Sequence, residues 1–180
     1  NKGYVERKKS KGTFIKEYEQ NVIYKGRIKG FTAETKERQI PLRSIVLDKK
    51  VIAASSTLCK NLKIAEGAPV FYVKRLRLIN NEPNTLVEDF VPYYFCPGIE
   101  KINFVNESLY ETLENIYHIV PHHARRIFES FRPSNKDDIS ALEIPPNSSV
   151  LFVESFVYLQ DNTPMEYYNA LVKGKYIVDV

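Results

Sequence analysis

The chain has 180 residues, of which 43% are hydrophobic and 27% are charged. Such a composition is typical of an ordinary globular protein, and the length suits one domain or one domain with an appendage. No apolar run approaches the roughly 20 residues of a membrane span, and the first residues lack a signal-peptide pattern. We therefore expect a cytoplasmic protein with no membrane partner.

The positive charge of the chain is concentrated at its N-terminus. The first 16 residues hold six Lys and Arg against one Glu, a net +5, so the remaining 164 residues carry −1 of the overall +4. A basic leader on a nearly neutral body indicates that the leader meets a polyanion. Residues 4–7 and 13–15 flank a turn and predict a short basic hairpin, with a solvated tail as the alternative.

The rest of the chain predicts a mixture of strands and short helices. Residues 16–22 are interpreted as a linker. Helices are predicted over residues 33–38, 55–62, 108–117 and 136–142, and strands over residues 42–53, 70–79, 84–92, 122–132, 150–159, 165–171 and 176–180. This order predicts an α+β fold, an antiparallel sheet of about six strands with helices packed on it.

Residues 62–83 and 142–164 are nearly the same pattern written twice. Each copy contains a helix end, a turn, a long apolar strand, a polar turn and a second strand, which predicts an internally repeated sheet with a site where the halves meet. The copies differ at two positions: Arg75 and Arg77 in the first correspond to Ser155 and Val157 in the second. The fold itself therefore does not require the arginines.

Arg75 and Arg77 are expected on one face of their strand, roughly 6.6 Å apart along the backbone. A buried charge without a partner costs several kcal/mol, so each guanidinium group requires an anion. An internal carboxylate would meet this need as well as a ligand would. Two fork-shaped donors side by side favour a phosphate or carboxylate ligand.

Three other residues could take part in the same site. Ser108, followed by Glu111, has the pattern of a capping box, and the start of the helix that it opens is a potential anion site. The alternative is that Ser108 only caps the helix and that Tyr110 is a half-buried surface aromatic residue. Glu166 is either a surface carboxylate or an acceptor for the hydroxyl groups of a ligand.

Catalytic and metal-binding patterns are weak, and we expect no cofactor and no metal. The three histidines fall within six residues, but a proline between them breaks the helix that would align them. Asp137 and Asp138 fit the first turn of a helix better than an acid/base pair. Cys59 and Cys96 are expected to be small buried thiols rather than a disulfide.

Several short motifs together resemble a known family. Residues 11–15 resemble the wing end of the winged-helix domain in GntR-type transcription regulators, and the rest of the chain resembles the effector-binding (UTRA) domain of their HutC subfamily. The motifs are Gly30-Phe31-Thr32, the Arg-Leu-Arg strand ending in Asn-Glu-Pro, Pro97-Gly98, Ser108-Leu109-Tyr110 and Pro164-Met165-Glu166.

The resemblance implies a chorismate-lyase-like fold, a homodimer and a small effector, often a sugar phosphate. It divides the chain into the end of a DNA-binding wing (1–15), a linker (16–22) and an effector-binding domain (23–180). In the wing, the DNA-contacting residues would be Lys9, Lys11 and Gly12. Matched positions imply phosphate contacts from Thr32, Arg75, Arg77, Ser108 and Tyr110, and contacts to the polar body of the ligand from Phe31 and Glu166.

Two positions depart from the amino-sugar-responsive members of the family. Val87 stands where those members carry a second sugar-contacting Glu, while Glu88 is expected on the opposite strand face. Val172 stands where they carry a Tyr, so N-acetylglucosamine 6-phosphate is not assigned as the ligand. We expect a ligand-responsive, repressor-type regulator. The alternatives are a lyase-like enzyme acting on a small anionic ring compound and a protein-interaction module whose arginines pair internally.

Overall fold

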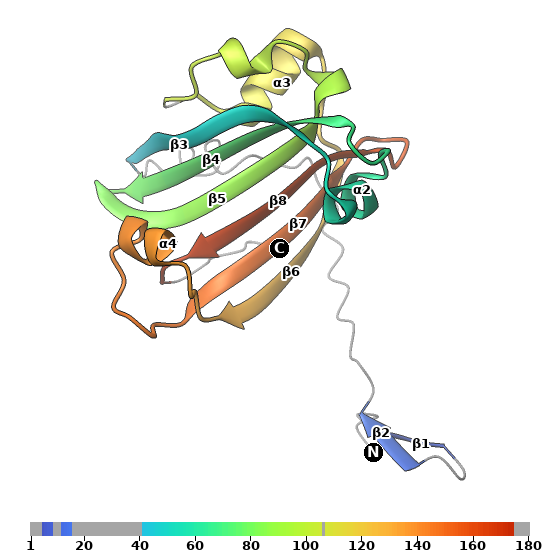
Figure 1. Ribbon diagram of the computed structural model, residues 1–180, viewed down its shortest axis with the longest axis vertical. Helices are drawn as coiled ribbons and strands as arrows, with labels where there is room; N and C mark the ends of the chain where they lie inside the picture. Colours follow the sequence, from blue (N-terminus) through green and yellow to red (C-terminus); the bar gives the residue numbers. More distant parts are fainter. Residues whose placement is uncertain (1–4, 9–11, 16–40, 106, 175–180) are drawn as a thin grey trace.

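A computed structural model describes residues 5–8, 12–15, 41–105 and 107–174 (Figure 1). The predicted linker, the helix over 33–38 and the strand over 176–180 lie outside these residues. The elements are β1 (Val5–Lys8), β2 (Gly12–Ile15), β3 (Leu42–Ala53), α2 (Ser56–Leu62), β4 (Pro69–Ile79), β5 (Glu82–Pro92), the 3-10 turns η1 (Tyr93–Phe95) and η2 (Ile99–Lys101), α3 (Leu109–Tyr117), β6 (His123–Phe131), α4 (Lys136–Ala141), β7 (Val150–Tyr158) and β8 (Pro164–Val172).

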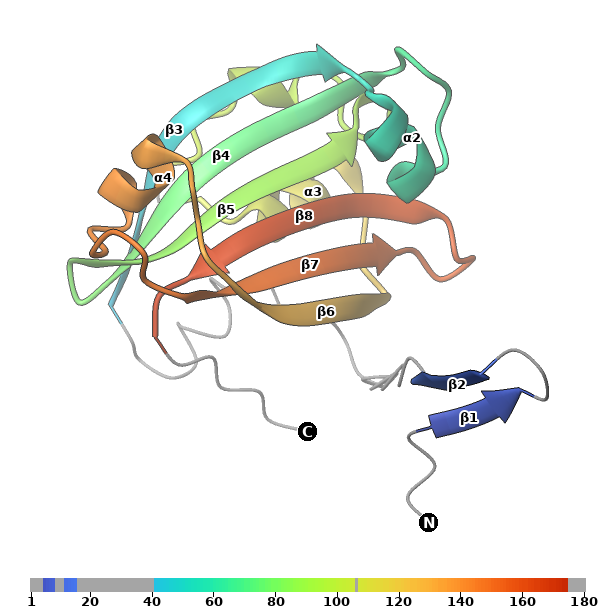
Figure 2. The ribbon, with the colours of Figure 1, turned by 60° about the horizontal axis from the view of Figure 1, so that its bottom comes forward.

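The main body is built on one six-stranded sheet with the strand order β3-β4-β5-β8-β7-β6. All neighbouring strands are antiparallel. The unit β3-α2-β4-β5 is repeated as β6-α4-β7-β8, and the two units meet where β5 pairs with β8 (Figure 2). The predicted α+β class and internal repeat are therefore confirmed.

The basic N-terminal segment contains a two-stranded sheet of its own. Strands β1 and β2 pair antiparallel, with Val5 opposite Ile15 and Lys8 opposite Gly12. The hairpin predicted over this segment is confirmed.

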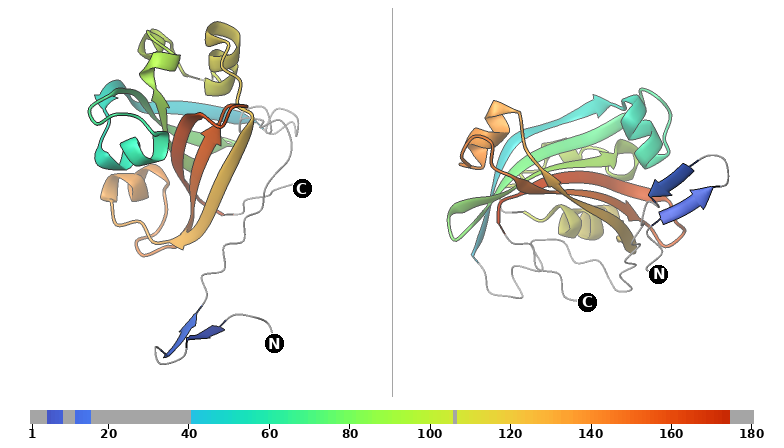
Figure 3. Two further views of the ribbon diagram at one scale, coloured as in Figure 1. Left: turned by 90° about the vertical axis from the view of Figure 1, so that its right-hand side faces the viewer. Right: turned by 90° about the horizontal axis from the view of Figure 1, so that it is seen from below.

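The two faces of the large sheet are covered by different helices. Helices α2 and α4 lie on one side, and α3 with the two 3-10 turns lies on the other (Figures 2 and 3). We call the second side the α3 face. Since side chains alternate along a strand, the odd-numbered residues of β4, such as Phe71 and Val73, point to the α3 face.

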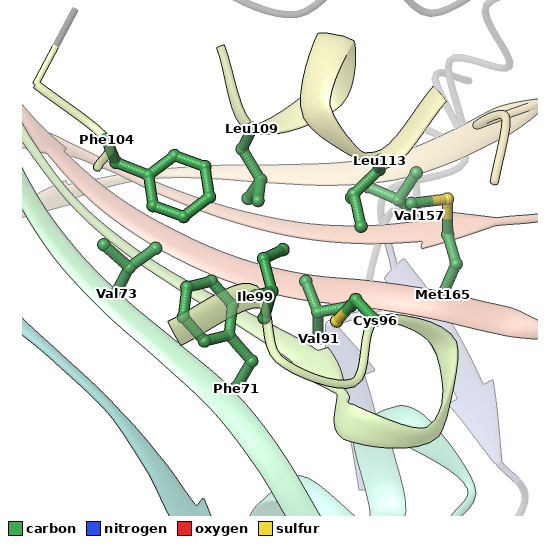
Figure 4. Close-up of a cluster of buried hydrophobic side chains, with 10 residues drawn as sticks. All are labelled: Phe71, Val73, Val91, Cys96, Ile99, Phe104, Leu109, Leu113, Val157 and Met165. Carbon is green, nitrogen blue, oxygen red and sulfur yellow. The ribbon is translucent and has the colours of Figure 1, made fainter. Parts of the chain in front are cut away.

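Helix α3 is held on the sheet by a dense apolar cluster (Figure 4). Ser108 caps the helix by accepting the backbone N–H of Glu111 at 3.3 Å, as its sequence pattern predicts. The cluster contains Phe71, Val73, Val91, Cys96, Ile99, Phe104, Leu109, Leu113, Val157 and Met165. This packing fixes the start of α3 against the sheet, beside the polar residues described below.

Replacing Leu113 by alanine is expected to lower the free energy of unfolding by about 2–5 kcal/mol, since Leu113 is fully buried in that cluster. Ile116→Ala on the same helix is the matched control, because Ile116 is 57% exposed and its truncation should change stability by less than about 0.5 kcal/mol. Urea denaturation of both variants measures the difference. Equal effects would show that α3 is not anchored as described.

Candidate ligand-binding site

The pairing of the strands places a group of polar side chains together on the α3 face. Asp89 of β5 lies opposite Tyr168 of β8, and Arg75 of β4 lies opposite the next inward residue of β5, Val87. By strand alternation, Arg77 and Glu166 share this face. We call Arg75, Arg77, Asp89, Glu166 and Tyr168, with Tyr110 from α3, the polar cluster.

Arg75 is held by an internal carboxylate. Its Nη2 donates to Oδ2 of Asp89 at 2.7 Å, and the two residues are only 1% and 3% exposed. The Nε atom of Arg75 is also buried but has no hydrogen-bond partner among the described residues. Asp89 therefore supplies the anion that the buried charge requires, while a donor of the same guanidinium group is left for a ligand.

Arg77 lies beside Arg75 and is partly buried. Burial and the neighbouring Arg75 charge lower the pKa of Arg77 to about 10, against the opposing effect of Asp89. At neutral pH the group is still a cation. Two arginine charges therefore share a largely buried region that contains two carboxyl groups, Asp89 and Glu166.

Glu166 is the second buried carboxyl group and is 1% exposed. Burial and the charge of Asp89 raise the pKa of Glu166 to about 8, and the hydrogen bond from Tyr110 and the arginine charges only partly oppose this. The Tyr110 hydroxyl donates to Oε2 at 2.5 Å, whereas Oε1 has no partner among the described residues. Because its pKa is raised, Glu166 offers the arginines less negative charge than an ordinary carboxylate would.

Stability should fall as the pH rises from about 4.5 to about 8, because the folded protein retains a proton on Glu166 that the unfolded chain releases. One such proton changes the free energy of unfolding by up to about 1.4 kcal/mol per pH unit. Glu166→Gln should flatten this part of the profile, which urea denaturation at a series of pH values measures. The exposed Glu111→Gln variant is the control. Parallel profiles for wild type and Glu166→Gln would contradict the raised pKa.

Of the residues expected in the site, Arg75, Arg77, Tyr110 and Glu166 come together in the polar cluster. Ser108 is buried at the start of α3, where it caps the helix two residues before Tyr110. Phe31, Thr32, Lys9 and Lys11 lie outside the described residues, and Gly12 begins β2.

The two departures from the family pattern lie next to the cluster. Val87 and Val172 are buried in an apolar group with Val153 and Ala170, and Val87 pairs directly with Arg75. Glu88 points to the opposite face, as predicted, where it accepts the Tyr72 hydroxyl at 2.8 Å. The surroundings of Arg75 are therefore apolar on this side, whereas Arg77 pairs with the buried polar residues Ser44 and Thr85.

Asp137 and Asp138 lie in the first turn of α4, as predicted, after the cap residue Asn135. Cys59 and Cys96 are free thiols; Cys96 is buried, which raises its pKa to about 12, and Cys59 is only half-buried. Within the described ranges there is no group of three or more His, Cys, Asp or Glu side chains that could hold a metal ion. None of the described helices could span a membrane.

Comparison with known proteins gives a consistent result. The family model for the UTRA domain matches residues 37–177. NagR of Bacillus subtilis, an HTH-type transcriptional repressor, is 24% identical over 97% of this chain and 70% of its own length. GmuR of the same species, an HTH-type transcriptional regulator, is 27% identical over 92% of this chain and 70% of its own length.

A solved structure shares the fold. The effector domain of PhnF from Mycobacterium smegmatis superimposes with a TM-score of 0.75, covering 81% of this chain and 88% of that domain at 19% identity. At this identity the likeness concerns the fold alone. The polar cluster described above is thus built on an architecture already found in effector domains.

Proposed function

The chain belongs to the UTRA domain family of GntR-type transcription regulators, and on this premise we propose that it binds a small phosphorylated metabolite of the sugar-phosphate class. The observation that carries the proposal is the buried Nε of Arg75, which has no hydrogen-bond partner among the described residues, beside a second guanidinium group, that of Arg77. Asp89 already pairs with Nη2 of Arg75. A phosphate group would accept from Nε of Arg75 and from the neighbouring Arg77, a geometry that two guanidinium groups favour.

The internal repeat supports a ligand role for these arginines. Ser155 of β7 occupies the repeat position of Arg75 and is fully buried, and β7 pairs on both sides although the strand itself contains no arginine. The second copy of the motif therefore forms the same sheet without arginines. Since the sheet forms without arginines at these positions, a role in ligand binding best explains Arg75 and Arg77.

The remaining residues of the expected site would add further contacts to the ligand. The first backbone N–H groups of α3, which begins after Ser108, favour an anion. Glu166 and Tyr110 would meet the hydroxyl groups of the sugar, with Phe31 and Thr32 completing the contacts. Nothing in the polar cluster calls for chemistry on the ligand, so we assign it binding and no enzymatic activity.

In the whole regulator, ligand binding would control DNA binding. Residues 1–15 would be the end of the winged-helix domain, in which Lys9, Lys11 and Gly12 contact DNA. Residues 16–22 would link it to the effector-binding domain, 23–180, in a homodimeric repressor. A coupling of about 1–3 kcal/mol between effector and DNA is typical of such control.

A thermal-shift panel on this chain tests the proposal. The probes are the 6-phosphates of glucose, glucosamine, N-acetylglucosamine and fructose, each beside its parent sugar and beside inorganic phosphate. A ligand at 100 times its dissociation constant adds about 2.7 kcal/mol of stability, which is roughly 5–10 °C in a protein of this size. At least one ester should reach this shift while its parent sugar does not. If no ester does so, the proposal is wrong.

A further inference from the structure

A third arginine lies on the α3 face, on the far side of the polar cluster from Arg75. Arg126 in β6 pairs with Ser155 in β7, and Ser155 pairs with Tyr168 in β8. Cross-strand partners share a face of the sheet, so Arg126 points to the same side as Tyr168 and Arg75. It is partly buried there.

The charge of Arg126 influences Tyr110 of the polar cluster. Burial and Glu166 raise the pKa of Tyr110 well above its usual value, and the charge of Arg126 opposes this rise. Since the Tyr110 hydroxyl is bonded to Glu166, Arg126 lies near that hydrogen bond. Arg75 and Arg77 act on Glu166 from β4. The buried carboxyl group therefore lies between two cationic regions.

Two buried polar atoms between these regions lack partners. The Ser155 hydroxyl oxygen and Oε1 of Glu166 form no hydrogen bond with any described residue, although the two residues are 0% and 1% exposed. Glu166 pairs with Val157, two residues from Ser155 on the same face. Leaving a buried polar group without a hydrogen bond is unfavourable. A ligand in contact with both atoms would supply the missing hydrogen bonds.

The spacing suits a ligand that is anionic at both ends. Arg75 and Arg126 are separated by four interstrand steps, roughly 19 Å along the sheet, and both have long side chains that point to the same side. A phosphate alone would occupy only the end at β4. Hydroxyl groups fit the middle, where Tyr110, Glu166 and Ser155 offer donors and acceptors.

We propose that Arg126 and Ser155 form a second anion-binding end of the site, and that the effector is a phosphorylated sugar acid. The carboxylate of the effector is held by Arg126 and its phosphate by Arg75 and Arg77. This assignment rests on the proposed function above and narrows it to ligands with two anionic groups.

Titration calorimetry on this chain compares matched probes: the 6-phosphates of glucose, mannose and galactose, and the 6-phosphates of the corresponding hexonic acids. The added carboxylate should tighten binding by about 10- to 150-fold for at least one pair, as a charge-assisted hydrogen bond does. Arg126→Gln should abolish this preference, and it should weaken binding of the hexose 6-phosphate much less than binding of the acid. Arg126→Lys should restore part of it.

Arg125→Gln is the matched control, because Arg125 is the exposed neighbour on the opposite strand face; it should keep the preference. Thermal denaturation of each variant confirms folding. The second anion-binding end is overturned if hexonic acid 6-phosphates bind no more tightly than hexose 6-phosphates, or if Arg126→Gln weakens binding of both classes equally. In either case the proposed function stands. If no phosphorylated probe binds, both are overturned.

Discussion

Replacing Asp89 by alanine is expected to lower the free energy of unfolding by about 3–5 kcal/mol, because it leaves the Arg75 guanidinium group buried without its carboxylate. Urea denaturation measures the loss. Asp48→Ala is the matched control, since the Asp48–Lys50 pair is exposed and is worth less than about 1 kcal/mol. Equal losses in the two variants would mean that the buried pair does not stabilise the fold.

The Asp89→Ala variant also distinguishes the two anions that can pair with Arg75, the Asp89 carboxylate and the phosphate of a ligand. In Asp89→Ala, a bound phosphate ester replaces the lost carboxylate, so the ester should raise the midpoint of thermal unfolding more than it does in the wild type. The double variant Arg75→Met, Asp89→Leu removes both charges and should recover most of the lost stability. It should no longer respond to the ester as the wild type does.

Replacing Arg77 by alanine is expected to weaken binding of a phosphate ester by roughly 10- to 150-fold, which corresponds to a charge-assisted hydrogen bond of about 1.5–3 kcal/mol. Titration calorimetry with the ester that gives the largest thermal shift measures this. Arg43→Ala is the control, because Arg43 is exposed and adjacent to Ser44, which pairs with Arg77. Binding within about threefold of wild type in Arg77→Ala would exclude Arg77 from the site.

The elements of the fold were largely predictable because their signals are local. Strand β3 has the predicted bounds, Leu42–Ala53, and Ser55 and Ser108 cap their helices as their positions in the sequence indicate. Strand β5 begins two residues earlier than expected, at Glu82, because Asn80 and Asn81, both at positive φ, form the turn alone. Alternation along β4 also correctly places Arg75 and Arg77 on the face away from Glu88.

The partners of these arginines were not predictable, because they depend on pairing between distant strands. Asp89 reaches Arg75 only through the register of β4 with β5. Tyr168 and Arg126 join the same face only because β8 inserts next to β5, about 80 residues away along the chain. One signal in the sequence could have indicated Asp89 as the partner of Arg75. Alternation along β5 places Asp89 on the same face as Val87, and therefore on the face of the sheet that carries the arginines.

A crystal structure of the chain with the stabilising phosphate ester bound tests most directly whether Arg75 and Arg77 bind the phosphate. We expect phosphate oxygens within about 3 Å of the guanidinium nitrogens of Arg77 and Arg75, with sugar hydroxyl groups at Glu166 and Tyr110. An ester bound away from the α3 face would contradict the proposed site. So would an ester on that face whose phosphate touches neither arginine.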